Sequence, residues 1–187
     1  MANKIMFGLK NVHYAKLTET VLTSGEITYS YGDVKPWLGA VSLGLDPQGD
    51  TLKEYADNTE WYTQAVNNGY EGDFEYEVMP DDFRKNILGE TLDTSGVFTE
   101  KNDTPTVYFA LFFEVDGDAK NRRNVFYKCS ATRENNANQT KGENIEPTHG
   151  TITITAVARA DGKVKASTSE NVDTSVYNGW YSSVYGG

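Results

Sequence analysis

Acidic residues alternate with apolar ones in one segment of the chain, Tyr70 to Val78. Successive side chains of a strand point to opposite faces, so the acidic residues should share one face and the residues between them should face the core. We call the four acidic residues the acidic row: Glu71, Asp73, Glu75 and Glu77. Because like charges side by side repel, this face needs water or cations next to it. The pattern predicts a negatively charged sheet surface, and a plain solvated outer face is the alternative.

The acidic row also raises the question of catalysis, because pairs of carboxylates hydrolyse glycosidic bonds. Such a pair needs one acid in an apolar pocket, across a cleft from the other. Four acids on one strand instead share a single open face. A glycosidase acting through Glu75 or Glu77 is therefore the least supported interpretation, and we expect that the chain is not an enzyme.

Few other residues have the type and spacing for chemistry. The single cysteine, Cys129, lies on a predicted strand with no histidine near it in sequence, which favours a small buried side chain over a nucleophile. The two histidines, His13 and His149, are too far apart in sequence for a zinc motif. Phosphate-binding loops, nucleophile elbows and dinucleotide fingerprints are absent from the sequence. We therefore predict no catalytic, cofactor-binding or metal-binding residue.

Composition narrows the classes of protein to which the chain can belong. The chain has 187 residues with 27 acidic and 17 basic side chains, which gives a net charge of −10 and a length typical of one domain. A hydrophobic content of 38% is enough for a core and excludes wholesale disorder. Apolar runs fall short of the roughly 20 residues that span a bilayer, so we expect a chain made in the cytoplasm without membrane contact. Net negative charge opposes tight binding of nucleic acid.

The elements that must position these residues are mainly strands. Segments rich in Val, Ile, Thr, Tyr and Phe alternate with period two between closely spaced turn signals. Two of these signals, Asp46-Pro47-Gln48-Gly49 and Asn67-Asn68-Gly69, are interpreted as the reversals of two hairpins. The predicted strand pairs are Val41–Leu45 with Thr51–Ala56, Thr59–Val66 with Tyr70–Met79, Thr106–Val115 with Asn124–Arg133, and Thr151–Ala160 with Lys163–Ala166.

One helix is predicted, at about residues 80–88. Pro80 suits its first position, two aspartates favour its positive end, and Gly89 suits its stop. The polar segments 92–103 and 134–146 are predicted to be long loops. We expect one β domain over residues 1–166, followed by a Ser-, Thr-, Tyr- and Gly-rich C-terminal extension over 167–187. The aromatic residues of this extension are expected to pack on another protein surface, which the sequence does not identify.

Several blocks of sequence succeed one another in a particular order. They are Gly8–Ala15, Gly39–Leu43, Glu54–Asn58, Gly69–Gly72, Met79–Phe83, Ile87–Gly89 and Phe113–Asp118. Together these blocks resemble the major tail tube protein of long-tailed, non-contractile phages (siphoviruses) of Gram-positive bacteria. The resemblance covers about residues 8–166, and the C-terminal extension lies outside it.

The resemblance implies a β-sandwich or half-barrel with one short flanking helix. It implies hexameric rings that stack into a hollow tube in the virion tail, through which double-stranded DNA passes during ejection. The implied partners are further copies of the chain, the tape-measure protein, the tail terminator and the distal tail protein. A ring protein like that of type VI secretion is one alternative. A carbohydrate-binding β-sandwich is another, because 12 Tyr and three Trp could stack on sugars.

The resemblance also suggests roles for particular surfaces. DNA carries about one negative charge per 1.7 Å of axis, so an acidic row facing the lumen would repel the duplex and prevent adhesion. Free sheet edges are expected to be completed by neighbouring copies. Polar segments 35–49 and 134–146 are expected to order when a neighbouring ring arrives. Three basic residues are predicted to contact another subunit or ring, with a solvated hairpin tip as the alternative: Lys120, Arg122 and Arg123.

Overall fold

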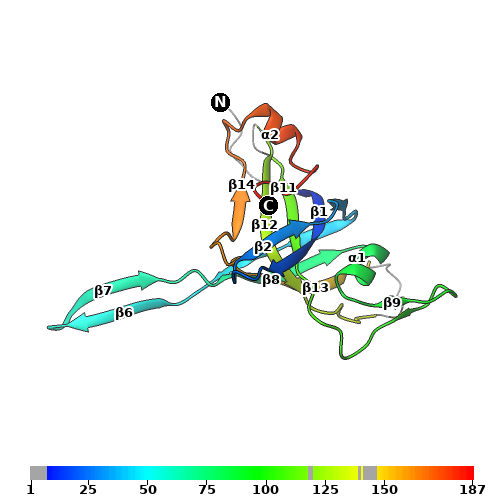
Figure 1. The fold of residues 1–187 in the computed structure, drawn as a ribbon, viewed down its shortest axis with the longest axis horizontal. Helices are drawn as coiled ribbons and strands as arrows, with labels where there is room; N and C mark the ends of the chain where they lie inside the picture. Colours follow the sequence, from blue (N-terminus) through cyan, green and yellow to red (C-terminus); the bar gives the residue numbers. More distant parts are fainter. Residues whose placement is uncertain (1–7, 118–119, 139, 141–146) are drawn as a thin grey trace.

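The computed structural model describes residues 8–117, 120–138, 140 and 147–187. Its main feature is one curved antiparallel sheet with the strand order β2-β1-β11-β12-β13-β8-β4 (Figure 1). The strands of this path are β1 (Leu9–Val21), β2 (Ile27–Tyr31), β4 (Ala40–Leu43), β8 (Gly69–Tyr76), β11 (Phe109–Val115), β12 (Arg122–Ala131) and β13 (Gly150–Ala156). The prediction of a mainly β fold, consistent with a β-sandwich, is confirmed.

Shorter strands attach to this sheet or stand apart from it. The attached strands are β3 (Lys35–Pro36) on β1, β5 (Asp46–Gln48) on β8, and β14 (Lys165–Ser167) on β12. The separate hairpins are β6 (Thr51–Ala56) with β7 (Thr59–Ala65), and β9 (Thr91–Leu92) with β10 (Phe98–Thr99). Segment 92–103, predicted as a loop, therefore contains part of a short hairpin. Of the predicted loop 134–146, residues 139 and 141–146 lie outside the described residues.

The segment 35–43 connects the two ends of the curved sheet. Its first part, β3, pairs with β1, and the amide of Trp37 donates to the carbonyl of Val12 at 2.8 Å. Its second part, β4, pairs with β8 at the far end of the strand order. At these borders β3 and β4 become outer strands of the sheet beside β1 and β8, and completion of the sheet edges by neighbouring copies stays a prediction. The expectation that segment 35–49 orders only on ring stacking is therefore wrong, since it forms β3, β4 and β5 within one chain.

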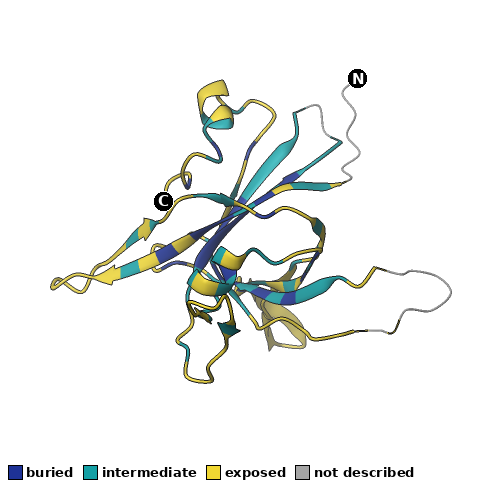
Figure 2. Cartoon of the chain, turned by 90° about the vertical axis from the view of Figure 1, so that its right-hand side faces the viewer, coloured by how far each residue is buried: buried dark blue, intermediate teal, exposed yellow. Residues whose placement is uncertain are grey.

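An aromatic core fills the concave side of the sheet. Trp37 lies at its centre, with ring centroids 4.9 Å from Phe74, 5.0 Å from Tyr76 and 4.5 Å from Phe83. The indole N–H of Trp37 donates to the carbonyl of Val78 at 3.1 Å, so the ring is buried without losing a hydrogen bond. Figure 2 shows the buried residues concentrated in the central strands. This core holds β8, and with it the acidic row, in a fixed position.

The predicted helix is confirmed as α1 (Asp81–Asn86), with Pro80 as its N-cap residue. Its Phe83 is fully buried and packs edge-on against Phe109, with the ring centroids 5.2 Å apart. The carboxylate of Asp82 accepts hydrogen bonds from Tyr14 and Lys35, which tie the first turn to β1 and β3. The helix is six residues long, so tertiary packing rather than intrinsic propensity keeps it formed.

The C-terminal segment, residues 167–187, packs on the convex side of the same sheet and includes a second helix, α2 (Thr174–Asn178), which the sequence did not predict. Trp180 and Val184 are buried against an apolar patch on β1, β11 and β12. The patch consists of Ala15, Ala110, Phe112, Val125 and Tyr127. Figure 1 shows α2 at the upper end of β11 and β12, with the C-terminus in front of them. The expected docking of the aromatic tail therefore takes place on its own domain.

The predicted strand pairing is correct for β11 with β12 and wrong elsewhere. Segment 51–56 pairs with 59–65 across Asp57 and Asn58, whose positive φ values of 50° and 60° suit a tight reversal. Neither segment pairs with the strand predicted for it, because β4 and β5 both pair with β8. The last hairpin is also wrong, since β14 pairs with β12 rather than with β13.

Candidate functional site

The acidic row lies on the convex face of β8, as the alternation predicts. Glu71 and Asp73 are exposed and Glu75 is half-exposed, whereas Phe74 and Tyr76 between them are fully buried. Glu77 comes directly after the last residue of the strand and is exposed. Val78, predicted to face the core, is instead 69% exposed, because the strand ends at Tyr76 and the alternation ends with it.

Hydroxyl groups on the neighbouring strands hold the carboxylates of the row. On β13, Thr153 donates to Asp73 at 2.9 Å and Thr155 donates to Glu71 at 3.3 Å. On the other side, Ser42 of β4 donates to Glu75 at 2.8 Å. Hydroxyls are neutral, so they orient the carboxylates without cancelling their charge. The result is a sheet face with ordered carboxylates on β8, and beyond the strand end Nδ1 of His149 lies 3.4 Å from Oε1 of Glu77.

The predicted contact residues Lys120 and Arg123 touch the C-terminal segment of the same chain. The ammonium of Lys120 donates to the carbonyl of Val172 at 3.0 Å and lies 5.2 Å from the ring centre of Tyr177. The guanidinium of Arg123 lies 3.8 Å from that ring and donates to the backbone carbonyl of Tyr177. Arg122 lies half-buried beside them on β12. The role of these residues between subunits stays a prediction.

A buried carboxylate anchors this basic cluster. Glu114 is 2% exposed and accepts from Arg123 Nε at 3.0 Å and from Asn11 Nδ2 at 3.2 Å. Burial alone would raise the pKa of Glu114, but the hydrogen bonds from Asn11 and Arg123 outweigh it and hold the pKa below its usual value. Tyr181 of the C-terminal segment adds its hydroxyl at 3.4 Å. The network therefore links β1, β11 and β12 to the last residues of the chain.

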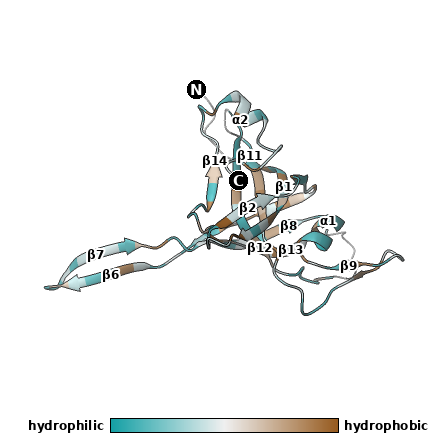
Figure 3. Cartoon of the chain, viewed as in Figure 1, coloured by the Kyte–Doolittle hydropathy of each residue, from teal (hydrophilic) through white to brown (hydrophobic). Residues whose placement is uncertain are grey.

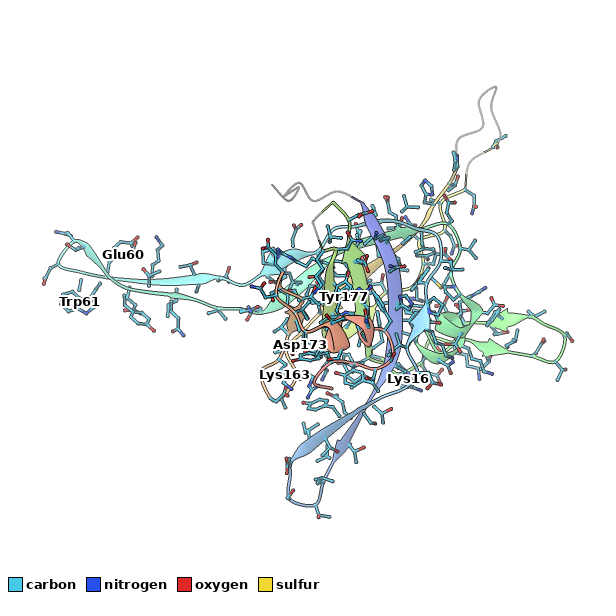
Figure 4. The ribbon with its side chains drawn as sticks, turned by 90° about the horizontal axis from the view of Figure 1, so that it is seen from above. Lys16, Glu60, Trp61, Lys163, Asp173 and Tyr177 are labelled. Atoms are coloured by element: carbon cyan, nitrogen blue, oxygen red, sulfur yellow. The ribbon has the colours of Figure 1, made fainter. Side chains whose placement is uncertain are left out.

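The β6–β7 hairpin projects from the body as an arm (Figures 1 and 4). Every residue from Thr51 to Ala65 is exposed, including Trp61 at 76% and Tyr55 at 66%. Figure 3 shows hydrophobic colouring on part of β6, away from the hydrophobic strands of the body. Polar contacts within the arm help to hold its two strands together, such as the 3.0 Å ion pair of Lys53 with Glu60. Sequence reasoning missed the arm, because its alternating pattern is the same as that of a strand with one buried face.

A hollow of about 430 Å³ lies between α1, the β9–β10 hairpin and the end of β12. Four of its charged residues form two ion pairs, Arg84 with Glu90 and Arg133 with Glu100, both at 2.7 Å. Cys129 is fully buried, as predicted, and this burial raises the pKa of its thiol. Among the residues that the structure describes, no group of three or more His, Cys, Asp or Glu is placed to hold a metal ion.

Comparison with known proteins adds no assignment. No protein-family model matches the chain, and no curated protein matches it. In the described ranges, no helix combines the length and the apolar character needed to cross a membrane. Two surfaces of the molecule bear on its function, the acidic row and the arm.

Proposed function

We propose that this chain is a structural subunit of a phage tail tube, in which copies assemble into stacked rings around a channel for DNA. The hexameric ring and the remaining tail partners are inferred from the sequence resemblance alone. The observation that carries the proposal is the arm, an entire hairpin exposed to solvent. The acidic row supports the proposal second, as a surface suited to the channel.

The arm is built for contact with another molecule. A two-stranded hairpin is at best marginally stable alone in water, and this one packs no residue from Thr51 to Ala65 into the body. Trp and Tyr are the residues most enriched among those that dominate the energy of protein interfaces, and the arm exposes Trp61, Tyr55 and Tyr62 together. We assign it to the contact between rings, where an arm of one copy packs on the body of another. Such a head-to-tail contact uses two different surfaces and so extends into a filament.

The acidic row supports the role of a channel lining. Its carboxylates are ordered by Thr153, Thr155 and Ser42, and they face away from the core. A duplex that carries about one charge per 1.7 Å is repelled by such a wall from every side and has no cationic contact to break in transit. We therefore place the convex face of β8 toward the lumen. The tape-measure protein would occupy the same channel before DNA enters.

Removal of the main apolar side chain of the arm tests the proposal. Sedimentation velocity over a concentration series should show large assemblies for the wild-type chain and a strong loss of them for Trp61→Ser. Val97→Ser is the matched control, because Val97 is an exposed apolar residue of a different hairpin, 55% accessible. Equal assembly of the Trp61→Ser and Val97→Ser variants would contradict the role of the arm.

A carbohydrate-binding module is the second candidate, favoured by the same exposed rings on the arm. It predicts a chain that stays monomeric at high concentration and binds polysaccharide through Trp61. Affinity electrophoresis in gels containing bacterial cell-wall polysaccharide separates the two functions. Retardation of a monomer that is lost in Trp61→Ser would favour sugar binding over tube assembly. A type VI-like ring protein would also assemble, so only the biological source of the tubes separates it from the phage protein.

A further inference from the structure

The arm joins the body through a short neck made of two segments of the chain. The outgoing segment leaves the body at Gln48, the last residue of β5, and the returning segment enters it at Gly69, the first residue of β8. These two residues face each other in the β5–β8 pairing, and Thr51 faces Ala65 where the arm begins. The arm is therefore the outward continuation of a ladder that begins in the body sheet. Both segments that the sequence predicts as turns, 46–49 and 67–69, lie in or beside this neck, and the chain does not reverse its direction at either of them.

The neck contains one extra residue on its returning side. Three steps lead from Gln48 to Thr51, whereas four lead from Ala65 to Gly69. Two backbone hydrogen bonds span this stretch, Val66 to Asp50 at 3.1 Å and Asn68 to Gln48 at 2.9 Å. An unequal count of this kind is a β-bulge, which bends a ladder and re-aims the strands beyond it. The direction of the arm is thus set by backbone geometry at the neck.

Glycine is required at both sides of this bend. Gly49 has a φ of +145°, and a Cβ built on it would lie 1.8 Å from the carbonyl oxygen of Val66. Gly69 has a φ of +97°, and its Cβ would lie 1.9 Å from the carbonyl oxygen of Ala156 at the end of β13. Real Cβ atoms essentially never come within 3.0 Å of another heavy atom in this way, so any side chain here must push backbone apart. At Gly49 the two segments of the neck therefore lie close together, and at Gly69 the neck lies close to the end of β13.

We infer that Gly49 and Gly69 are positioning residues that fix the direction of the arm, and that this direction decides whether the arm can reach a neighbouring ring. The second half of this inference rests on the proposed function. With a strand rise of about 3.3 Å per residue the tip lies roughly 20 Å beyond the neck, so a tilt of ~10° moves it by ~3.5 Å. Interfaces pack as densely as protein interiors, and a displacement of that size removes the match.

The direction of the arm can be measured without assembly. Spin labels at Asn58→Cys on the tip and Ser169→Cys on the body report their separation by double electron–electron resonance in dilute protein. The native Cys129 is fully buried and does not label. Gly49→Ala should shift or broaden the distance distribution. Deletion of Asn68 removes the extra residue without adding a side chain, and it should shift the distribution to a different distance from that of Gly49→Ala. Gly162→Ala is the matched control, because Gly162 also has a positive φ, +82°, but open space around its Cβ position.

Assembly is then compared among the same variants. Gly49→Ala should raise the concentration for half-assembly about tenfold or more, equivalent to about 1.4 kcal/mol, while keeping the wild-type unfolding midpoint. Added to Trp61→Ser, it should have little further effect, because both changes act through one contact. An unchanged distance distribution in Gly49→Ala would overturn the inference, whatever the assembly result. Normal assembly of Gly49→Ala despite a moved arm, with Trp61→Ser impaired, would overturn its second half, whereas an unimpaired Trp61→Ser would refute the proposed function instead.

Discussion

Replacing Trp180 by alanine should destabilise the fold strongly, although this residue lies in the terminal segment outside the sequence resemblance. The indole is 3% exposed and belongs to the same buried cluster as the small residues Ala15 and Ala110 of the sheet. It also stacks on Tyr185, with centroids 5.6 Å apart and planes at 17°. Truncation of a buried Trp or Phe to Ala costs about 3–5 kcal/mol, and the lower end is expected here because the segment lies near solvent and can partly collapse.

Urea unfolding followed by far-ultraviolet circular dichroism measures this loss. With an unchanged slope, the midpoint should fall by an amount equivalent to about 3 kcal/mol. In a chain of this size that corresponds to a fall of roughly 6–12 °C in the thermal midpoint. Ser182→Ala is the control, because Ser182 is an exposed residue of the same segment. A loss below about 1 kcal/mol for Trp180→Ala, within the range of ordinary substitutions, would refute the claim that the packing of the C-terminal segment on the sheet stabilises the fold.

Two further predictions concern charged groups. The folded-state pKa of Glu114 is lowered from 4.5, so its ionised form contributes stability above that pH and loses it as the pH falls through the lower folded value. Glu114→Gln should therefore flatten the decline of the unfolding midpoint below pH 4.5, and an equally steep decline would contradict the role of its network. Replacing the whole acidic row by Gln and Asn should leave tube assembly intact and slow DNA delivery in a phage complementation assay, whereas unchanged delivery through normal tubes would reject the lining role.

The sequence was sufficient to predict the acidic face and the short helix. Both arise from local rules: alternation along β8 separates Phe74 from Asp73 and Glu75, and Pro80 with two aspartates begins α1. Each signal is contained within about ten residues and needs no knowledge of distant partners. The alternation holds only as far as the end of the strand at Tyr76, so it assigns Val78 to the wrong face.

Signals that depend on a distant partner could not be interpreted correctly. Gly49 and Gly69 are typical of a turn, yet their positive φ serves a close approach to Val66 and Ala156 rather than a reversal. Similarly, the sequence near Trp180 does not indicate its partners, because the small residues Ala15 and Ala110 of its cluster are 70 or more positions away. The basic residues near the β11–β12 turn have the sequence pattern of an outward patch, but Arg123 is held by Glu114 and by the terminal segment.

Electron cryomicroscopy of the purified chain at high concentration tests the central claim most directly. The proposed function predicts hollow tubes of stacked rings, with the convex face of β8 lining the bore and each β6–β7 arm packed on the next ring. Single, unassembled copies at every concentration would contradict it. Tubes in which the acidic row lies on the outer wall would retain the assembly and reject the role given to the row.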